Sequence, residues 1–280
     1  MPLLLSYIVT SVMTEKASRN ANRDVGCSKI ISENEVAITV FGSLRIHTPQ
    51  GVLEEEQIRS PKFCRILVYL LINKRISYSQ MQIWDAIWPE ETFYKSSSSS
   101  NFRGLLHRFH QLFSLISKEK LIESTPSGYH FNPKLTIKTD LEQFDWELRM
   151  VHNATNRNKR IEHIKRAISI FKGEIYPPAS GEHWLIGASN YYTFRYIRLV
   201  NELLKYLAER QEFDAIHYYA TQSLQIVPTN VKAFYWLIVV LYRKGAVELA
   251  KTELERARKT LDVEEYTDLI RILKNIDGIF

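Results

Sequence analysis

Hydrophobic and polar positions divide the chain into two regions with different periodicities. From Val36 to about residue 58, apolar and polar residues alternate with the period of two that is typical of strands. A turn at Thr48 to Gly51 would bend this segment into a small sheet. Further along, apolar residues recur three and four positions apart, as on one face of a helix. The pattern therefore predicts a small N-terminal sheet followed by helices.

Two helices are predicted directly after this sheet. Ser60 and Pro61 suit the cap and the first position of a helix, and they precede an apolar stripe that runs from Phe63 to Leu71. After a short extended link, Ser79 is a cap for a second helix, which Pro89 ends. Both helices are expected to bury one face.

A third helix is predicted within residues 95–113, where a run of five serines precedes Asn101 and offers several N-caps. On a helical wheel this segment has one apolar and one polar, basic side. The apolar side holds Phe102, Leu105, Leu106, Phe109, Leu112, Phe113 and Ile116. The polar side holds Ser100, Arg103, Gly104, His107 and Gln111.

A hairpin is expected after this helix, with one strand at Leu121 to Ser124, a turn through Thr125 to Gly128 and a second strand from Tyr129. From Asp140 onward the pattern is helical. Helices are predicted at about 158–171, 190–210, 212–226, 230–243 and 246–260, with a break at 172–174, a loop at Pro177-Pro178 and a separate segment at Trp184.

Helix pairs with a spacing near 34 residues are typical of tetratricopeptide-like repeats. We equate Ala215 with Ala250 as small residues early in the second helix of each pair, and Pro228 lies between pairs. The aromatic residues Tyr191, Tyr192, Phe194, Tyr196, Trp184 and Trp236 allow two interpretations, a ligand pocket or the core of the repeats. We favour the core.

Charge changes this picture because it is unevenly divided among the 280 residues. Residues 36–139 hold thirteen Lys and Arg against eight Asp and Glu, whereas residues 140–280 hold twenty against nineteen. A basic excess in one region suits a surface that binds phosphate groups.

Short motifs for catalysis are absent from the sequence, so we expect no enzyme and no cofactor. Cys27 and Cys64 lie far apart and form no metal-binding motif, which fits a cytoplasmic protein. His107 and His110 are three residues apart with no third ligand nearby, so no metal site is expected.

The N-terminal residues 1–35 are interpreted as a flexible lead-in. The first 13 residues are apolar but too few to span a membrane, so no membrane anchor is expected. One hypothesis is that translation starts at Met13.

Several segments between residues 36 and 139 resemble one known family in order and spacing. They are FGSLRI, RSPKFCRILVYLL, ISYSQMQIWDAIWP, SSSSSNFRGLLHRFHQLF and IESTPSGYHF. This set resembles the OmpR-type winged-helix DNA-binding domain of SARP-type bacterial transcriptional activators. The resemblance implies that the third helix enters the major groove of double-stranded promoter DNA and that the hairpin is a wing.

The candidate DNA contacts follow from the resemblance and from the polar face. Arg103 and His107 are one turn apart and suit base edges, whereas Arg108 suits a phosphate. Where such helices usually end in Leu-Arg, this chain has Phe109-His110. The full set is Ser100, Asn101, Arg103, His107, Arg108 and His110 on the helix, Arg59 and Lys62 near the first helix, and Ser127 and Tyr129 in the wing. For Tyr129, packing on a neighbouring strand is the alternative.

Residues 140–280 resemble the bacterial transcriptional activation domain that follows the winged helix in the same family. The segments that carry this resemblance are DLEQF, AISIFKGEIY, LAERQEFDAI, VPTNVKAF and RKGAVELAKTELERARKTL, together with Trp184. The predicted fold is thus an α+β winged helix-turn-helix domain (36–139) followed by an all-α, tetratricopeptide-like domain (140–280).

The expected function is that of a transcription regulator, an activator that recruits RNA polymerase or forms a homodimer through its helical half. Two alternatives stay open: an interaction scaffold with degenerate DNA binding, and a regulator that senses a small molecule in the repeat domain. The first predicts weak, nonspecific retention on heparin, and the second predicts stabilisation by a ligand.

Overall fold

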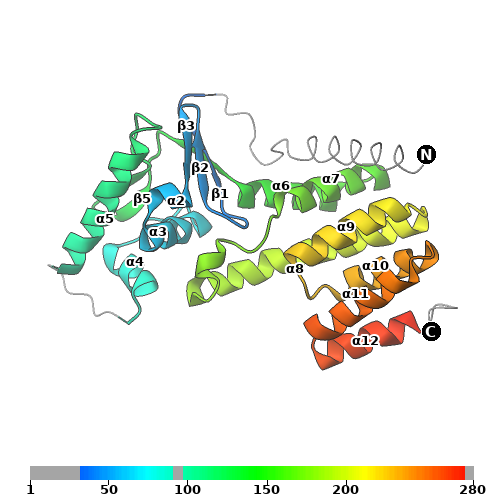
Figure 1. The fold of residues 1–280 in the computed structure, drawn as a ribbon. Coiled ribbons are helices and arrows are strands. Elements are labelled where there is room, and N and C mark those ends of the chain that lie inside the picture. The colour runs from blue at the N-terminus through cyan, green and yellow to red at the C-terminus, as the bar shows by residue number, and fades with distance from the viewer. Residues whose placement is uncertain (1–31, 91–96, 275–280) are drawn as a thin grey trace, which may run out of the picture.

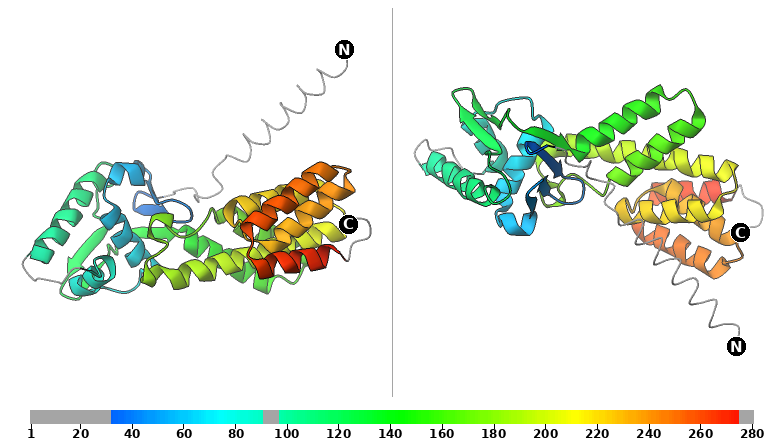
Figure 2. Two further views of the ribbon diagram at one scale, coloured as in Figure 1. Left: turned by 60° about the horizontal axis from the view of Figure 1, so that its bottom comes forward. Right: turned by 90° about the horizontal axis from the view of Figure 1, so that it is seen from above.

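The computed structural model describes residues 32–90 and 97–274, and Figure 1 shows an α+β region followed by a helical region. This order confirms the predicted fold class. The views in Figure 2 show an elongated molecule, with α5 near one end and α9 to α12 at the other. Nearly all of the lead-in, including Met13, lies outside the described residues, as do the first two positions of the segment 95–113.

The sheet at the start of the described chain has four strands in the order β3-β2-β1-β6. The first three strands follow each other in antiparallel order, as the alternating pattern predicts, and their buried residues include Ile38 and Ile46, both 0% exposed. The fourth strand was not predicted, and it pairs in parallel with the first. The strands are β1 (Glu35–Thr39), β2 (Arg45–Thr48), β3 (Gly51–Glu54) and β6 (Thr136–Thr139).

A short helix, α2 (Glu55–Ile58), replaces the end of the predicted strand-like segment. The backbone N–H of Glu54 donates to Oε1 of Gln57 at 2.8 Å, and this reciprocal cap satisfies donors at the start of the helix. The strand prediction was therefore wrong for these residues, because a local cap outweighs the alternating pattern.

The three predicted helices and the hairpin are confirmed. Ser60 accepts from the N–H of Phe63 at 3.3 Å, and Ser79 accepts from the N–H of Gln82 at 3.2 Å, so both predicted caps form. The elements are α3 (Pro61–Ile72), α4 (Gln80–Ile87), α5 (Ser97–Phe113), β4 (Ile122–Thr125) and β5 (Gly128–Phe131).

The second half of the described chain is helical and differs from the prediction in three ways. The Trp184 segment is not separate, because it belongs to a single helix of 27 residues, and the last helix was not predicted. Helices α9 and α11 begin at Phe213 and Val247, a spacing of 34 residues, so Ala250 corresponds to Ile216 and not to Ala215. The elements are α6 (Asp140–Asn153), α7 (Arg157–Ile170), the 3-10 helix η1 (Pro177–Ala179), α8 (His183–Glu209), α9 (Phe213–Ile226), α10 (Val231–Arg243), α11 (Val247–Thr260) and α12 (Val263–Leu273).

The core interpretation of the aromatic residues holds for only some of them. Tyr196 is fully buried and stacks on Phe171 with ring centroids 4.5 Å apart. Tyr191 and Phe194 are instead 45% and 60% exposed, so for these two residues the core interpretation was wrong. Both residues lie on α8 at positions that do not share a helix face with the buried Tyr196, so their side chains point toward solvent.

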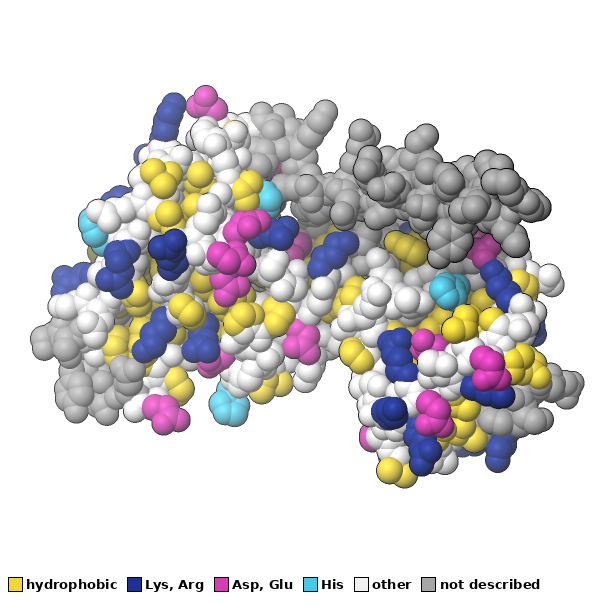
Figure 3. All heavy atoms as spheres, in the orientation of Figure 1, with side chains coloured by type: hydrophobic (Ala, Val, Ile, Leu, Met, Phe, Trp, Pro, Cys, Tyr) yellow, Lys and Arg dark blue, Asp and Glu magenta, His cyan; other side chains and the backbone are white. Residues whose placement is uncertain are grey.

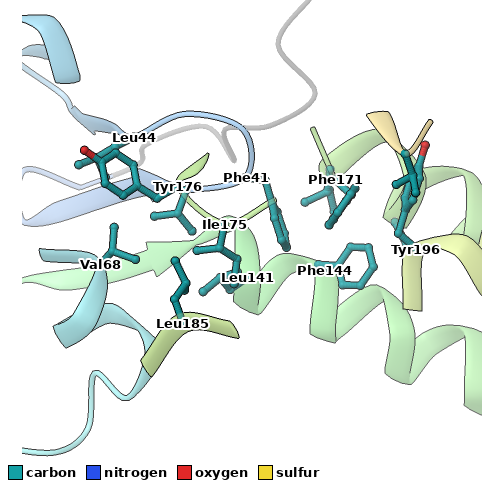
Figure 4. Close-up of a cluster of buried hydrophobic side chains, with 14 of the residues drawn as sticks. Phe41, Leu44, Val68, Leu141, Phe144, Phe171, Ile175, Tyr176, Leu185 and Tyr196 are labelled. Atoms are coloured by element: carbon teal, nitrogen blue, oxygen red, sulfur yellow. The ribbon is translucent and has the colours of Figure 1, made fainter. Parts of the chain in front are cut away.

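A single apolar core joins the two halves of the molecule (Figure 4). The Phe41 ring lies 5.7 Å from Phe144 and 4.9 Å from Phe171, which places a residue of the α+β half among helical residues. Thr139 ends β6 and also caps α6, with its hydroxyl accepting from the N–H of Glu142 at 3.1 Å. The domain boundary between residues 139 and 140 stays a proposal. It separates two regions of the sequence, but the side chains on both sides of it pack into one core.

Candidate nucleic-acid interface

The inner face of α5 holds this helix against the rest of the α+β half. Phe102, Phe109 and Phe113 are at most 3% exposed, and the rings of Phe109 and Phe63 stack with centroids 4.0 Å apart. Stacked, buried aromatic rings provide a large apolar contact with a defined geometry. The predicted apolar face is confirmed, and it fixes which side of α5 meets solvent.

The outer face of α5 is polar, basic and exposed, as predicted. The exposed residues are Ser100, Asn101, Arg103, His107, Arg108 and Gln111. Nε of Arg103 donates to the carbonyl oxygen of Ser99 at 3.2 Å, so this side chain lies back along its own helix. An exposed bond of this kind exchanges readily for a stronger partner. Figure 3 shows Lys and Arg side chains over the region of α3, α4 and α5.

The first turns of α4 and α5 meet through a contact that was not predicted. The Ser99 hydroxyl donates to Oε1 of Gln80 at 3.2 Å. This bond orients the start of α5 relative to α4, as a helix-turn-helix requires. The sequence signal near this contact is the Ser79 cap, which predicts that α4 begins at Gln80 but does not predict the bond to Ser99.

His110 is half-buried near the end of α5 and differs from the exposed residues. Burial lowers its pKa, the Lys120 cation lowers it further, and a hydrogen bond with the backbone of Ile122 opposes the shift. The imidazole is therefore neutral at pH 7. His110 provides no positive charge at the position where arginine is usual in the helices that α5 resembles in sequence.

The wing hairpin separates its two candidate contacts. Ser127 is exposed at the tip, where its hydroxyl lies 2.7 Å from that of Thr125. Tyr129 is 8% exposed, its ring packs edge-on against Phe102 at 4.7 Å, and its backbone exchanges two hydrogen bonds with Tyr78. The Tyr129 ring therefore packs in the core against α5, and not on the neighbouring strand as the alternative had it, and this burial weighs against the expected DNA contact.

Gly128 supports this packing, and we expect Gly128→Ala to destabilise the wing by about 2 to 4 kcal/mol. Its φ of +122° disfavours a side chain, and an added Cβ would lie 2.4 Å from the carbonyl oxygen of Tyr78. Urea unfolding followed by circular dichroism measures the loss. Gly104→Ala is the control, since a Cβ there meets nothing within 4 Å. Equal stability of both variants would contradict the close approach.

Arg59 and Lys62 lie at the start of α3 and not on α5. Arg59 is exposed with a left-handed φ of 51° at the end of α2. The ammonium group of Lys62 lies 4.9 Å from the centre of the Trp88 ring, beside the end of α4. These two cations therefore come from the junction of α2 and α3 and not from α5.

A metal site and a membrane-spanning helix receive no support from the described residues. Within residues 32–90 and 97–274, no group of three or more His, Cys, Asp or Glu side chains is arranged to hold a metal ion. Over the same ranges, none of the helices is both long and apolar enough to cross a membrane.

Comparisons with known proteins support the fold and not an identity. No protein-family model matches this chain, and no curated protein sequence matches it either. Among solved structures, the chain is similar to Mycobacterium tuberculosis EmbR in complex with a low affinity phosphopeptide, with a TM-score of 0.57 and 16% sequence identity. The match covers 85% of this chain and 65% of the EmbR chain. It agrees with a sheet and wing region followed by a mostly helical region.

Proposed function

We propose that this chain is a cytoplasmic, DNA-binding transcription regulator, an activator that binds promoter repeats through α5 and the wing. The observation that carries the proposal is the exposed, basic outer face of α5 on a helix whose inner face is locked into the core. A rigid helix with a basic face suits the major groove of double-stranded DNA. The fold similarity to EmbR supports this proposal at the level of architecture.

The contacts divide by their position on the surface. Arg103 and His107 read base edges, with Ser100 and Asn101 beside them at the start of α5. Arg108 binds a phosphate, and a second group of backbone contacts comes from Arg59, Lys62 and the exposed Ser127. His110, neutral and half-buried, takes no phosphate.

Arg103→Ala tests the base contact. We expect it to weaken specific DNA binding by about 1 to 3 kcal/mol, since arginine to guanine is a strong contact for discrimination. Genomic fragments selected by the purified protein provide the site, and a mobility shift over a salt series gives the affinities. Parent and variant should both bind more weakly as the salt concentration rises.

Arg258→Ala is the matched control, because Arg258 is an exposed arginine on α11. It should bind DNA like the parent. Equal affinity of the Arg103 variant and the parent for the selected fragment would refute the role of Arg103.

The helical half, residues 140–280, acts as a tetratricopeptide-like array that recruits RNA polymerase or forms a homodimer. The spacing of 34 residues between the starts of α9 and α11 supports a repeat of this kind. The chain carries out no catalysis in this proposal.

A second candidate is a scaffold that has lost DNA binding, and the neutral His110 favours it. A scaffold would elute from heparin at low salt and would select no preferred fragment. Selection of one recurring sequence from genomic DNA would instead support the regulator.

A further inference from the structure

A groove of about 670 Å³ runs between α6 and α8 on the helical half. Its apolar residues are Leu148, Val151 and Leu199, of which the last two are each 5% exposed. The charged side chains around them come from three helices. They are Asp145 and Arg149 on α6, Arg160 on α7, and Arg195, Arg198 and Glu202 on α8.

The groove has an excess of positive charge. Glu202 is neutralised by Arg160, whose Nε and Nη2 donate to the two carboxylate oxygens at 2.5 and 2.9 Å. Among the described residues, Arg149, Arg195 and Arg198 form no ion pair within 4.0 Å, and the carboxylate that acts electrostatically on Arg149 and Arg195 is Asp145. Asp145 is the remaining carboxylate, and it accepts from the Tyr192 hydroxyl at 3.0 Å. Three arginines therefore face one carboxylate.

One exposed aromatic ring lines the same groove, and a second lies one turn further along α8. Tyr191 lines it, and the Arg195 guanidinium lies 5.1 Å from the centre of the Tyr191 ring. The next turn of α8 repeats this arrangement, with Arg198 lying 6.0 Å from the Phe194 ring. Exposed aromatic residues and arginine are enriched in protein interfaces and in their hot spots. Because the rings of Tyr191 and Phe194 are exposed, packing of the core does not explain their presence on α8.

A second hollow, about 520 Å³ in volume, continues the groove toward the α+β half. It shares Asp145 and Arg149 with the groove and adds Arg75 and Ile76, which follow α3. A ligand that occupies both hollows would thus contact both halves of the molecule.

We propose that the α6–α8 groove binds an acidic, amphipathic helix of a partner protein. Apolar residues of that helix pack on Leu148, Val151 and Leu199, while its carboxylates pair with the arginines. A nucleic acid fits less well, because the apolar floor offers nothing to phosphates and Asp145 repels them. This inference rests on the proposed function only in taking the helical half to bind a partner protein, and it adds the chemistry of that partner.

Peptide binding without DNA tests the proposal independently of α5. The probe is a fluorescein-labelled peptide of 14 residues, the length of α6, with Leu at three- and four-residue spacing and Glu elsewhere. Fluorescence anisotropy compares it with a scrambled peptide of the same composition and with a version in which Lys replaces Glu. Random-sequence duplex DNA serves as a competitor.

The full-length parent should bind the patterned Glu/Leu peptide best, and the double variant Arg195→Glu with Arg198→Glu should bind it at least about tenfold more weakly. The neutral variant Arg195→Gln with Arg198→Gln should show a smaller loss, which separates a charge effect from misfolding. Lys159→Glu with Arg166→Glu, which reverses two exposed charges on α7, is the matched control and should bind like the parent.

Three results would overturn the proposal. They are the absence of saturable binding of the Glu/Leu peptide, equal binding of the Lys/Leu peptide, and binding that the α8 variants leave unchanged. Displacement of the peptide by random DNA, with loss of that DNA binding in the α8 variants, would assign the groove to nucleic acid instead. Specific DNA binding through α5 is measured separately, so either result stands without the other.

Discussion

Asp140→Ala is expected to lower the free energy of unfolding by about 2 to 6 kcal/mol near pH 4, where the parent carboxyl is protonated. Oδ2 of Asp140 accepts from the backbone N–H groups of Val40 and Phe41, both at 2.8 Å. These donors are buried at the junction of the two halves, and alanine leaves them without an acceptor. Each unsatisfied buried donor costs about 1 to 3 kcal/mol.

The effect of Asp140 depends on pH because burial raises its pKa from 3.8 to about 6, against the opposing hydrogen bonds from Phe41, Val40 and Leu141. The folded state therefore binds more protons than the unfolded state between about pH 4 and pH 6. The contribution of Asp140 to the free energy of unfolding therefore falls by about 3 kcal/mol as the pH rises through that window. The destabilisation by alanine should accordingly be smaller at pH 7 than at pH 4.

Asp140→Asn is the control, because it keeps a carbonyl acceptor and removes the ionisable group. Urea unfolding at a series of pH values should show that the difference in stability between parent and Asn variant changes across this window. Parallel curves for the two proteins would contradict the raised pKa of Asp140.

Phe109→Ala is expected to cost about 3 to 5 kcal/mol, the usual range for removing a buried phenylalanine. The ring is 3% exposed and lies between Phe63 at 4.0 Å and Phe113 at 5.7 Å. The cavity would loosen α5 against α3, so the same variant should also bind DNA more weakly under the proposed function. Denaturant unfolding and a mobility shift measure the two effects.

Two further variants make this test specific. Phe109→Leu keeps most of the volume and should cost less than alanine at this position. Leu115→Ala changes an apolar residue that is 74% exposed just after α5, and its stability should stay within about 0.5 kcal/mol of the parent. A Phe109→Ala protein as stable as the Leu115→Ala protein would contradict the packing of α5.

Most of the helices were predictable because their signals are local, although α12 was missed. A cap such as Ser60 or Ser79 and an apolar stripe act within a few residues, and the two faces of α5 follow from the helical period alone. The same locality explains the error at Glu55–Ile58, where a four-residue helix is too short for its period to stand out. It also explains the merged α8, since no strong break separates Trp184 from the residues that follow.

Contacts between distant segments were not predictable from these local patterns. Nothing near Thr136–Thr139 indicates that this strand pairs with β1, about a hundred positions earlier. Nor does the sequence around Asp140 indicate that its carboxylate accepts hydrogen bonds from the backbone N–H groups of Val40 and Phe41. Tyr129 has the sequence of a wing residue, yet its contact with Phe102 places it in the core. The groove between α6 and α8 likewise depends on side chains that come together from α6, α7 and α8.

The sequence by itself determined the helical periods, most of the caps, the charge division and the basic face of α5. The tertiary structure alone decided which halves share a core, which candidate residues reach solvent and where arginines from different helices gather. The physical reason is that period and capping depend on neighbours along the chain, whereas burial and electrostatic environment depend on neighbours in space.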